Sequence, residues 1–242
     1  MTVRANVPAT EWGRRASTLY QREYAQQYRA HDEALGGVAA FVFLSEWIGR
    51  VAASCPPRFS ALDLGCGTGR YFWAIQGAAA IVGIDASAAM LEQARQPLDA
   101  NRISATSIQL IEGDLLTYPF EARSFDLVYA IGVLAEHSPL DGRVVSNVAR
   151  WLKPGGGFAF TTVHPDSPSI PRTVGRTLGH WMAPLTGGAL RRSLRRALLS
   201  GGLYADEMRV RELLTPSFDI ESLSTFESEA HLHCVCVARK PS

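Results

Sequence analysis

Hydrophobic and polar positions follow two different periods along this chain. Short apolar runs, each typical of a buried strand, end at polar or glycine residues and occupy 59–64, 80–85, 107–112, 125–131 and 157–163. Helical spacing characterises the segments 10–30, 38–53, 69–77, 87–96 and 141–152, and two further strand-like runs occupy 218–225 and 231–239. Strands that alternate with helices predict an α/β fold, with a doubly wound, mostly parallel sheet covered by helices on both faces.

A glycine-rich turn follows the first strand-like run, in the segment ALDLGCGTGR (61–70). Glycine tolerates positive φ and has no Cβ, so Gly65 and Gly67 allow the backbone to approach a ligand closely. The spacing differs from that of dinucleotide-binding proteins, because Arg70 stands where their third glycine would be. Asp63 would repel a pyrophosphate and attract an ammonium, while the first N–H groups of the helix predicted next would attract an anion. The turn therefore favours a ligand with both an ammonium and a carboxylate, such as the amino-acid end of methionine.

Acidic residues also stand at the ends of the next two runs. Asp85 ends IVGID, about 20 residues beyond the glycines, where an acid typically binds ribose hydroxyls. Asp114 ends IQLIEGD and is suited to accept from an adenine amino group. Ligands of such sheets bind beyond the carboxyl ends of the strands, and Ala130 also lies at such an end. Asp126 lies at the start of its strand, and we expect it to be structural.

These segments together resemble the class I S-adenosylmethionine-dependent methyltransferases. LDLGCGTG is similar to the first motif of that family, VGIDASAAML to its second, EGDLL to its adenine-side loop and LKPGGGF to the turn before its fifth strand. The resemblance covers roughly residues 58–163 and implies a Rossmann-like sheet of seven strands, the last antiparallel. It also implies S-adenosylmethionine as cofactor, with S-adenosylhomocysteine as product. The cofactor-binding residues that it implies are Asp63, Gly65, Cys66, Gly67, Asp85, Ala86, Met90, Asp114, Leu115 and Ala130.

The region before the first strand predicts helices that cover the cofactor. Tyr20, Tyr24 and Tyr28 are four residues apart and form one stripe, so Tyr20 and Tyr28 are candidates for cofactor contact. The alternative is a helix face that packs on the sheet, with its hydroxyls in water. We expect one structural domain overall, with a helical cap over 1–57 and a methyltransferase core over 58–242.

A change of pattern between 164 and 206 predicts a substrate lid inserted after the fifth strand. HPDSPSIPR is rich in proline and serine, and paired glycines bracket a leucine-and-arginine segment at 189–200. That segment predicts a short basic amphipathic helix. It could bind an anionic substrate, a membrane surface or RNA, or its charges could simply be solvated. We expect this region, together with 10–30, to form a mobile cover over the acceptor pocket.

Two histidines follow strands at the ligand edge and are candidate catalytic residues. His137 comes after the fourth strand and His164 directly after the fifth. An imidazole at this edge can take a proton from the substrate near neutral pH. The alternative is that each histidine shapes a loop or caps a helix. A base is also not strictly required, because positioning alone can remove about 7–11 kcal/mol of a barrier.

Composition limits the remaining options. The chain has 242 residues, 47% of them hydrophobic, and a net charge of +1, so no overall field draws it to nucleic acid or to a membrane. Its four cysteines show no metal-ligand or disulfide spacing, which predicts reduced thiols, no metal and a cytoplasmic location. No signal peptide or membrane-spanning run is evident.

The sequence predicts a methyltransferase that acts by in-line displacement on an O, N or C atom of a small molecule. A non-catalytic S-adenosylmethionine-binding partner protein is one alternative, although polar residues remain around the predicted pocket. RNA methylation is another, but it would favour a strongly basic surface. AIGVL follows the fourth strand in place of the Asn/Asp-Pro-Pro-Tyr signature of enzymes that methylate exocyclic nitrogens of nucleobases. We expect no DNA partner, and we expect nicotinamide dinucleotides not to bind.

Overall fold

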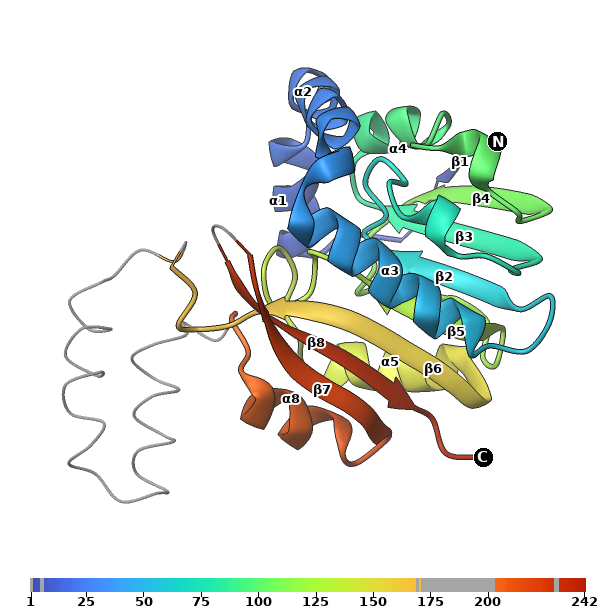
Figure 1. The fold of residues 1–242 in the computed structure, drawn as a ribbon, viewed down its shortest axis with the longest axis vertical. Coiled ribbons are helices and arrows are strands. Elements are labelled where there is room, and N and C mark those ends of the chain that lie inside the picture. The colour runs from blue at the N-terminus through green and yellow to red at the C-terminus, as the bar shows by residue number, and fades with distance from the viewer. Residues whose placement is uncertain (1, 5–6, 169, 171–202, 229–230) are drawn as a thin grey trace.

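The computed structural model describes residues 2–4, 7–168, 170, 203–228 and 231–242 (Figure 1). Its strands are β1 (Thr2–Arg4), β2 (Ser60–Leu64), β3 (Ala80–Asp85), β4 (Ser107–Glu112), β5 (Phe125–Ala130), β6 (Leu152–Val163), β7 (Asp219–Glu227) and β8 (Leu232–Arg239). Its α-helices are α1 (Glu11–Leu19), α2 (Arg22–Ala34), α3 (Ala39–Ala53), α4 (Ala88–Ala94), α5 (Gly142–Trp151) and α8 (Glu207–Leu214). Short 3₁₀ turns occupy η1 (Leu35–Gly37), η2 (Phe72–Ala74) and η3 (Ala100–Arg102).

The strands within the described residues form one sheet in the order β1-β4-β3-β2-β5-β6-β8-β7. Strands β1 to β6 run parallel to one another, and β8 is antiparallel to both β6 and β7. The predicted seven-stranded, mostly parallel sheet with an antiparallel last strand is confirmed. Strand β1 was not predicted, because a three-residue edge strand has too few positions to show an apolar period.

The alternation of side chains in β2 shows how the sheet separates two hydrophobic cores. Leu62 and Leu64 face the core that contains α5 and α8, whereas Ala61 faces the core that contains α3. Asp63 lies two residues from Ala61 and so points to the α3 face of the sheet. Helix α3 crosses that face (Figure 1), so residues 1–57 are continuous with the core through α3 and β1.

The predicted helix over 69–77 is absent, and a single 3₁₀ turn, η2, stands in its place. Gly69 has a φ of 73°, and a Cβ there would lie 2.6 Å from the ring of Phe72. Phe72 is fully buried, so its ring folds back over the glycine to reach the core. Burial of this aromatic side chain therefore outweighs helical spacing, and no α-helix begins at the glycine turn to attract an anion.

The predicted helix over 10–30 is two helices that meet at Tyr20 and Gln21. The Tyr20 carbonyl accepts a hydrogen bond from the Ser87 hydroxyl, which lies 67 residues away in the sequence. This carbonyl therefore points out of the helical ladder, and α1 ends. Ser87 also caps α4 as predicted, because its Oγ accepts from the N–H of Met90 at 3.2 Å.

Asp126 organises the opposite edge of the sheet from the ligand edge, as predicted for a structural residue. Its carboxylate accepts from the N–H of Ser60 at 2.8 Å and pairs with the ammonium of Lys153 at 2.7 Å. The starts of β2, β5 and β6 are thereby joined. Helix α8 was not predicted, and the predicted basic helix over 189–200 lies outside the described residues.

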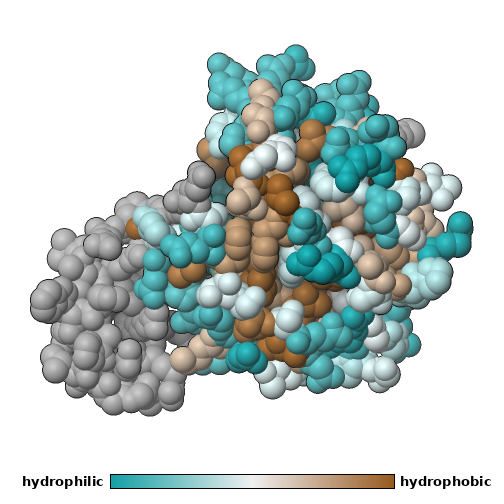
Figure 2. Space-filling model, in the orientation of Figure 1, coloured by the Kyte–Doolittle hydropathy of each residue, from teal (hydrophilic) through white to brown (hydrophobic). Residues whose placement is uncertain are grey.

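Hydrophobic residues gather in the middle of the face that α3 covers (Figure 2). Val42, on α3, and Val38, which precedes it, are exposed. Among the described residues no single helix is long and apolar enough to cross a membrane, and one bent pair, Arg22–Gly37 with Ala39–Ala53, passes that test by length and composition only.

Candidate functional site

A cavity with about 850 Å³ of empty volume, its open mouth included, lies at the carboxyl ends of β2, β3, β4 and β5. The structure brings most of the predicted site residues to this cavity: Tyr20, Tyr28, Asp63, Gly65, Cys66, Gly67, Asp85, Ala86, Met90, Asp114, Leu115 and His137. Ala130 is fully buried and does not line it. The cavity wall beyond β5 is formed instead by the next three residues, Ile131, Gly132 and Val133.

The glycine turn brings its backbone against the cavity without side chains in between. Gly65 and Gly67 have φ values of 71° and 54°, which favour glycine. A Cβ on Gly65 would lie 2.7 Å from the Val133 side chain. The N–H groups of Gly65 and Cys66 donate to the Ile84 carbonyl at 2.8 and 3.0 Å, which ties the turn to β3.

Asp85 supports the glycine turn and keeps acceptor capacity for a ligand. Its Oδ2 accepts from the N–H of Gly67 at 2.9 Å, and its Oδ1 accepts from the N–H of Ser87 at 2.8 Å. A carboxylate offers about four lone-pair sites, so Asp85 keeps acceptor capacity for a ligand. Burial raises the pKa of Asp85, and the backbone N–H groups of Ser87, Gly67 and Ala86 oppose that rise. The arrangement suits two neighbouring hydroxyl groups.

Among the described residues, no cationic side chain is in direct contact with the buried carboxyl of Asp63. Its side chain lines the cavity, yet only 4% of the residue is exposed. Burial raises the pKa of Asp63 to about 8, and the Asp85 charge adds to the rise. Tyr129 and Arg70 oppose it, although the Tyr129 hydroxyl falls short of full hydrogen-bond geometry. A ligand ammonium at this place would favour the ionised carboxylate.

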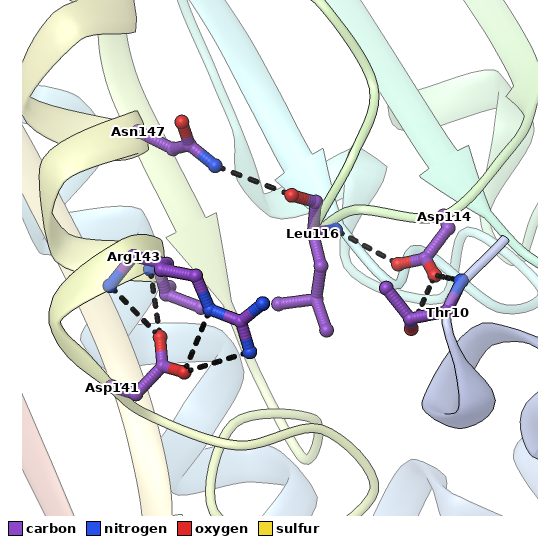
Figure 3. A network of polar contacts seen from close by, with 7 residues as sticks. Thr10, Asp114, Leu116, Asp141, Arg143 and Asn147 are labelled. Atoms are coloured by element: carbon purple, nitrogen blue, oxygen red, sulfur yellow. Dashed lines mark hydrogen bonds and ion pairs between the residues drawn. The ribbon is translucent and has the colours of Figure 1, made fainter. Parts of the chain in front are cut away.

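Asp114 accepts hydrogen bonds from the start of α1 (Figure 3), a contact that the sequence did not predict. Its Oδ2 accepts from both the N–H and the hydroxyl of Thr10, at 2.7 and 2.6 Å, and its Oδ1 accepts from the N–H of Leu116 at 2.8 Å. Three of about four lone-pair sites are therefore occupied by the protein itself. One acceptor site is left, so the expectation that Asp114 accepts from an adenine amino group stays a prediction.

The N-terminal helices cover the cavity, and α1 contributes lining residues that the sequence analysis missed: Trp12, Gly13 and Ala16. A Cβ on Gly13 would lie 2.4 Å from Asp114 Oδ2, so glycine permits this close approach. The signal in the sequence was a pair of small residues three positions apart, Gly13 and Ala16, that follow the threonine cap. Thr10 indeed caps α1, because its Oγ1 accepts from the N–H of Gly13 at 3.2 Å.

Arg70 connects the glycine turn to α2 through a buried ion pair. Its Nη1 lies 3.1 Å from Oδ1 of Asp32, which is 1% exposed and also accepts from the Thr68 hydroxyl. The guanidinium lies 5.2 Å from the ring centroids of both Tyr28 and Tyr71. The residue that replaces a third glycine thus holds the N-terminal cover in place. A long-range pair of this kind leaves no local sequence signal.

His137 lies at the cavity with two partners for the same nitrogen. Its Nε2 is 3.1 Å from the Tyr20 hydroxyl and 3.5 Å from Oε1 of Glu136. Burial raises the pKa of Tyr20, so the phenol is neutral at physiological pH and can donate to the imidazole or accept from the imidazolium. Nε2 of His137 can therefore accept a hydrogen bond from the Tyr20 hydroxyl, or donate one when a proton is bound there. Glu136 was not predicted as a site residue.

His164 lies away from the cavity, which corrects its assignment as a candidate base. The residue is 8% exposed, its Nδ1 accepts from the N–H of Asp166 at 3.1 Å, and its Nε2 lies 3.6 Å from Oε2 of Glu207. The strand β6 extends past the level of the cavity wall, so a residue at its end is carried beyond the site. Within the described residues, His137 is the histidine at the cavity.

This fold and site define an α/β protein with a Rossmann-like sheet and a ligand cavity at the carboxyl ends of its parallel strands. Residues 61–156 match the family model described as a methyltransferase domain. Over that stretch the chain is similar to methyltransferases.

Curated relatives match less than half of the chain. The chain is 38% identical over 109 residues to the malonyl-[acyl-carrier protein] O-methyltransferase of Legionella pneumophila, a match that covers 44% of this chain and 37% of that protein. It is 34% identical over 114 residues to the demethylmenaquinone methyltransferase of Lactiplantibacillus plantarum, with 45% and 47% covered. The chain thus matches less than half the length of these relatives.

Solved structures extend the likeness of the fold over nearly the whole chain. Magnesium protoporphyrin IX methyltransferase from Synechocystis, with S-adenosylhomocysteine bound, has a TM-score of 0.64 at 16% identity and covers 95% of this chain and 100% of its own. An N-methyltransferase from Bradyrhizobium japonicum has a TM-score of 0.62 at 16% identity, with 91% and 98% covered. At this identity the likeness establishes the fold.

Proposed function

We propose that this protein binds S-adenosylmethionine and transfers its methyl group to a small-molecule acceptor. The observation that carries the proposal is the meeting of Asp63, Asp85 and the positive-φ glycine turn in one cavity. The match of residues 61–156 to the methyltransferase-domain model supports the same reaction. The names of the two curated relatives, which specify methylation of an acyl-carrier-linked malonyl group and of a quinone precursor, support a small or carrier-linked acceptor.

The cavity fits each part of the proposed cofactor. Asp63 is a buried carboxyl with a pKa of about 8, and the ligand ammonium would supply the positive charge that it lacks. The free lone pairs of Asp85 match the two ribose hydroxyls. Leu115 and the α1 residues Trp12 and Ala16 offer an apolar surface for the adenine ring. Gly65 and Gly67 leave space at the turn for the amino-acid end of the cofactor to approach the backbone closely.

His137 and its neighbours can take up the proton that the acceptor loses. When bound, S-adenosylmethionine supplies a methyl group already activated on a sulfonium. The acceptor's O, N or C atom forms a bond to that carbon as the carbon–sulfur bond breaks, which leaves the thioether product. His137 then takes the acceptor's proton at Nε2, directly or through the Tyr20 hydroxyl 3.1 Å away. Glu136, 3.5 Å from the same nitrogen, stabilises the imidazolium.

Calorimetry and transfer of label test the proposal. We expect S-adenosylmethionine and S-adenosylhomocysteine to bind saturably and NADH not to compete, because Asp63 faces the space that a pyrophosphate needs. Methyl-labelled S-adenosylmethionine is then offered with a malonyl thioester, a reduced naphthoquinone and a primary amine, which represent O, C and N acceptors. Binding with no transfer to any acceptor would favour the non-catalytic alternative. Absence of S-adenosylhomocysteine binding would overturn the proposal.

A further inference from the structure

A second group of chemically reactive side chains lies apart from the cavity, at the end of β6. His164 directly follows β6, Glu207 begins α8 and Cys234 lies on β8. Their ligand atoms all lie within 4.8 Å of one another. Because β6 pairs with β8 through Thr162 and Cys234, three separate elements bring these side chains together. None of the three residues lines the cavity described above.

The geometry of the group is close to that of a metal site. In a tetrahedral zinc site, bonds of about 2.0–2.3 Å place ligand atoms roughly 3.3–3.6 Å from one another. His164 Nε2 and Glu207 Oε2 are already 3.6 Å apart. The thiol of Cys234 would need to approach by no more than about 1 Å, given the 4.8 Å limit. A nitrogen, a carboxylate oxygen and a thiolate sulfur are the three donor types that zinc uses in proteins.

Metal binding would exchange the partners that these side chains have now. Nδ1 of His164 would become protonated, so the Asp166 N–H that donates to it at 3.1 Å would need another acceptor. The Cys234 thiol donates to the Ala205 carbonyl at 3.7 Å, and that carbonyl keeps a 3.0 Å hydrogen bond from the Thr162 hydroxyl. With a metal on Nε2, the His164 ring carries its proton on Nδ1 and requires an acceptor there. The Asp166 carboxylate stands 3.8 Å from Nδ1 and can fill that place.

We propose that His164, Glu207 and Cys234 form a binding site for a divalent transition metal such as zinc, separate from the methyl-transfer site. The metal would join the end of β6 to the start of α8 and to β8. It would therefore connect the two ends of the stretch between His164 and Glu207. Burial raises the pKa of the Cys234 thiol to about 12, so binding must release the thiol proton to the solvent.

Cobalt(II) is the probe, with the reduced full chain expressed without a histidine tag. We expect one cobalt per chain, with visible d–d bands of tetrahedral geometry and a near-ultraviolet band from thiolate-to-metal charge transfer. Zinc should displace the cobalt and abolish both. Cys234→Ser should remove the charge-transfer band. His164→Gln and Glu207→Gln should each weaken binding at least roughly 100-fold, and Asp166→Ala should weaken it about 10- to 100-fold, as for an outer partner of a ligand.

Cys236→Ser is the matched control, because Cys236 is buried on the same face of β8 two residues away and lies outside the group. It should keep the full cobalt spectrum. Circular dichroism and affinity for S-adenosylhomocysteine identify any variant that fails to fold. X-ray absorption of the zinc-loaded wild-type chain gives a readout without variants, and we expect one sulfur ligand. Lack of stoichiometric cobalt binding, or a charge-transfer band that survives Cys234→Ser, would overturn the proposal.

Discussion

The Tyr20 hydroxyl lies 3.1 Å from Nε2 of His137, although 117 positions separate the two residues in the sequence. One belongs to the N-terminal cover, at the break between α1 and α2, and the other to the loop after β5. The contact exists only when the cover is in place over the cavity. We therefore predict that closure of the cover over a ligand also completes the group proposed to accept the substrate's proton.

Removal of His137 should slow methyl transfer more than it weakens cofactor binding. For an acceptor that must lose a proton, we expect His137→Gln to lower kcat about 10²- to 10⁴-fold at neutral pH, since a positioned base contributes that much. Tyr20→Phe should lower kcat by a smaller factor. Tyr24→Phe is the matched control, because Tyr24 is 42% exposed and is on the same helical cover. Rates that rise equally with pH in wild type and His137→Gln would contradict the base assignment.

Asp85→Asn should weaken S-adenosylhomocysteine binding. The substitution removes acceptor capacity for the ribose hydroxyls, and leaving such groups unpaired costs about 1–3 kcal/mol, which corresponds to roughly 5- to 150-fold in affinity. It also loosens the glycine turn, because Gly67 donates to this carboxylate. Isothermal titration calorimetry measures the change. Asp99→Asn, at an exposed turn where asparagine is equally suited to the φ of 50°, should bind like wild type. Unchanged affinity in Asp85→Asn would refute the ribose assignment.

Cofactor binding should release a proton from Asp63. In the free protein the pKa of Asp63 is about 8, raised by burial, so the carboxyl is mostly protonated at pH 6.5. A bound ammonium favours the carboxylate and lowers that pKa. The bound state therefore holds fewer protons, and affinity should rise as pH increases from 6 to 8 and level off above. Calorimetry at pH 6.5 in buffers of different ionisation enthalpy measures the released proton.

The same shift predicts how Asp63 affects stability. A carboxyl whose pKa is raised in the folded state stabilises the fold, and this contribution is fully present below its unfolded pKa of 3.8. The contribution is lost as pH rises toward about 8, the pKa in the folded state. Asp63→Asn should therefore raise Tm relative to wild type by an amount that grows between pH 5 and pH 8. It should also abolish the pH dependence of binding in that range. A constant Tm difference would show that Asp63 ionises freely in the folded protein.

Thr10→Ala should loosen α1 selectively. It removes the helix cap and one of the donors to buried Asp114, and loss of such a cap typically costs about 1 kcal/mol or more. Amides of α1 should then exchange hydrogen at least roughly five times faster, while those of the sheet are unchanged. Thr18→Ala, on the exposed side of the same helix, serves as the control. In wild type, S-adenosylhomocysteine should slow exchange in residues 10–34, and equal protection with and without ligand would show a fixed scaffold.

The parts of the molecule that depend on local pattern were predictable. The bounds predicted for β3 and β4 coincide with the structure, because a short apolar run between turn residues has few alternative conformations. The glycine turn and the acids at strand ends followed from the same logic, since parallel strands bring their carboxyl ends to one edge. Asp63 and Asp85 were found in this way.

The parts that depend on distant partners were not predictable. The helical spacing over 69–77 does not indicate that the Phe72 ring folds back over Gly69. The break between α1 and α2 at Tyr20 depends on a hydrogen bond from Ser87. Asp114 accepts hydrogen bonds from Thr10, which lies 104 positions away in the sequence. His164 stands at a strand end like the true lining residues, but the length of β6 carries it past the cavity.

The first turn of an isolated helix normally frays at almost no cost. In this chain Thr10 is both the cap of α1 and the source of two of the three hydrogen bonds that a 6%-exposed carboxylate receives. Fraying of the first turn of α1 would remove two hydrogen bonds from a buried carboxylate, and this cost keeps the turn in place. We therefore expect Thr10 to lengthen the time that a ligand stays in the cavity and so to slow the release of product.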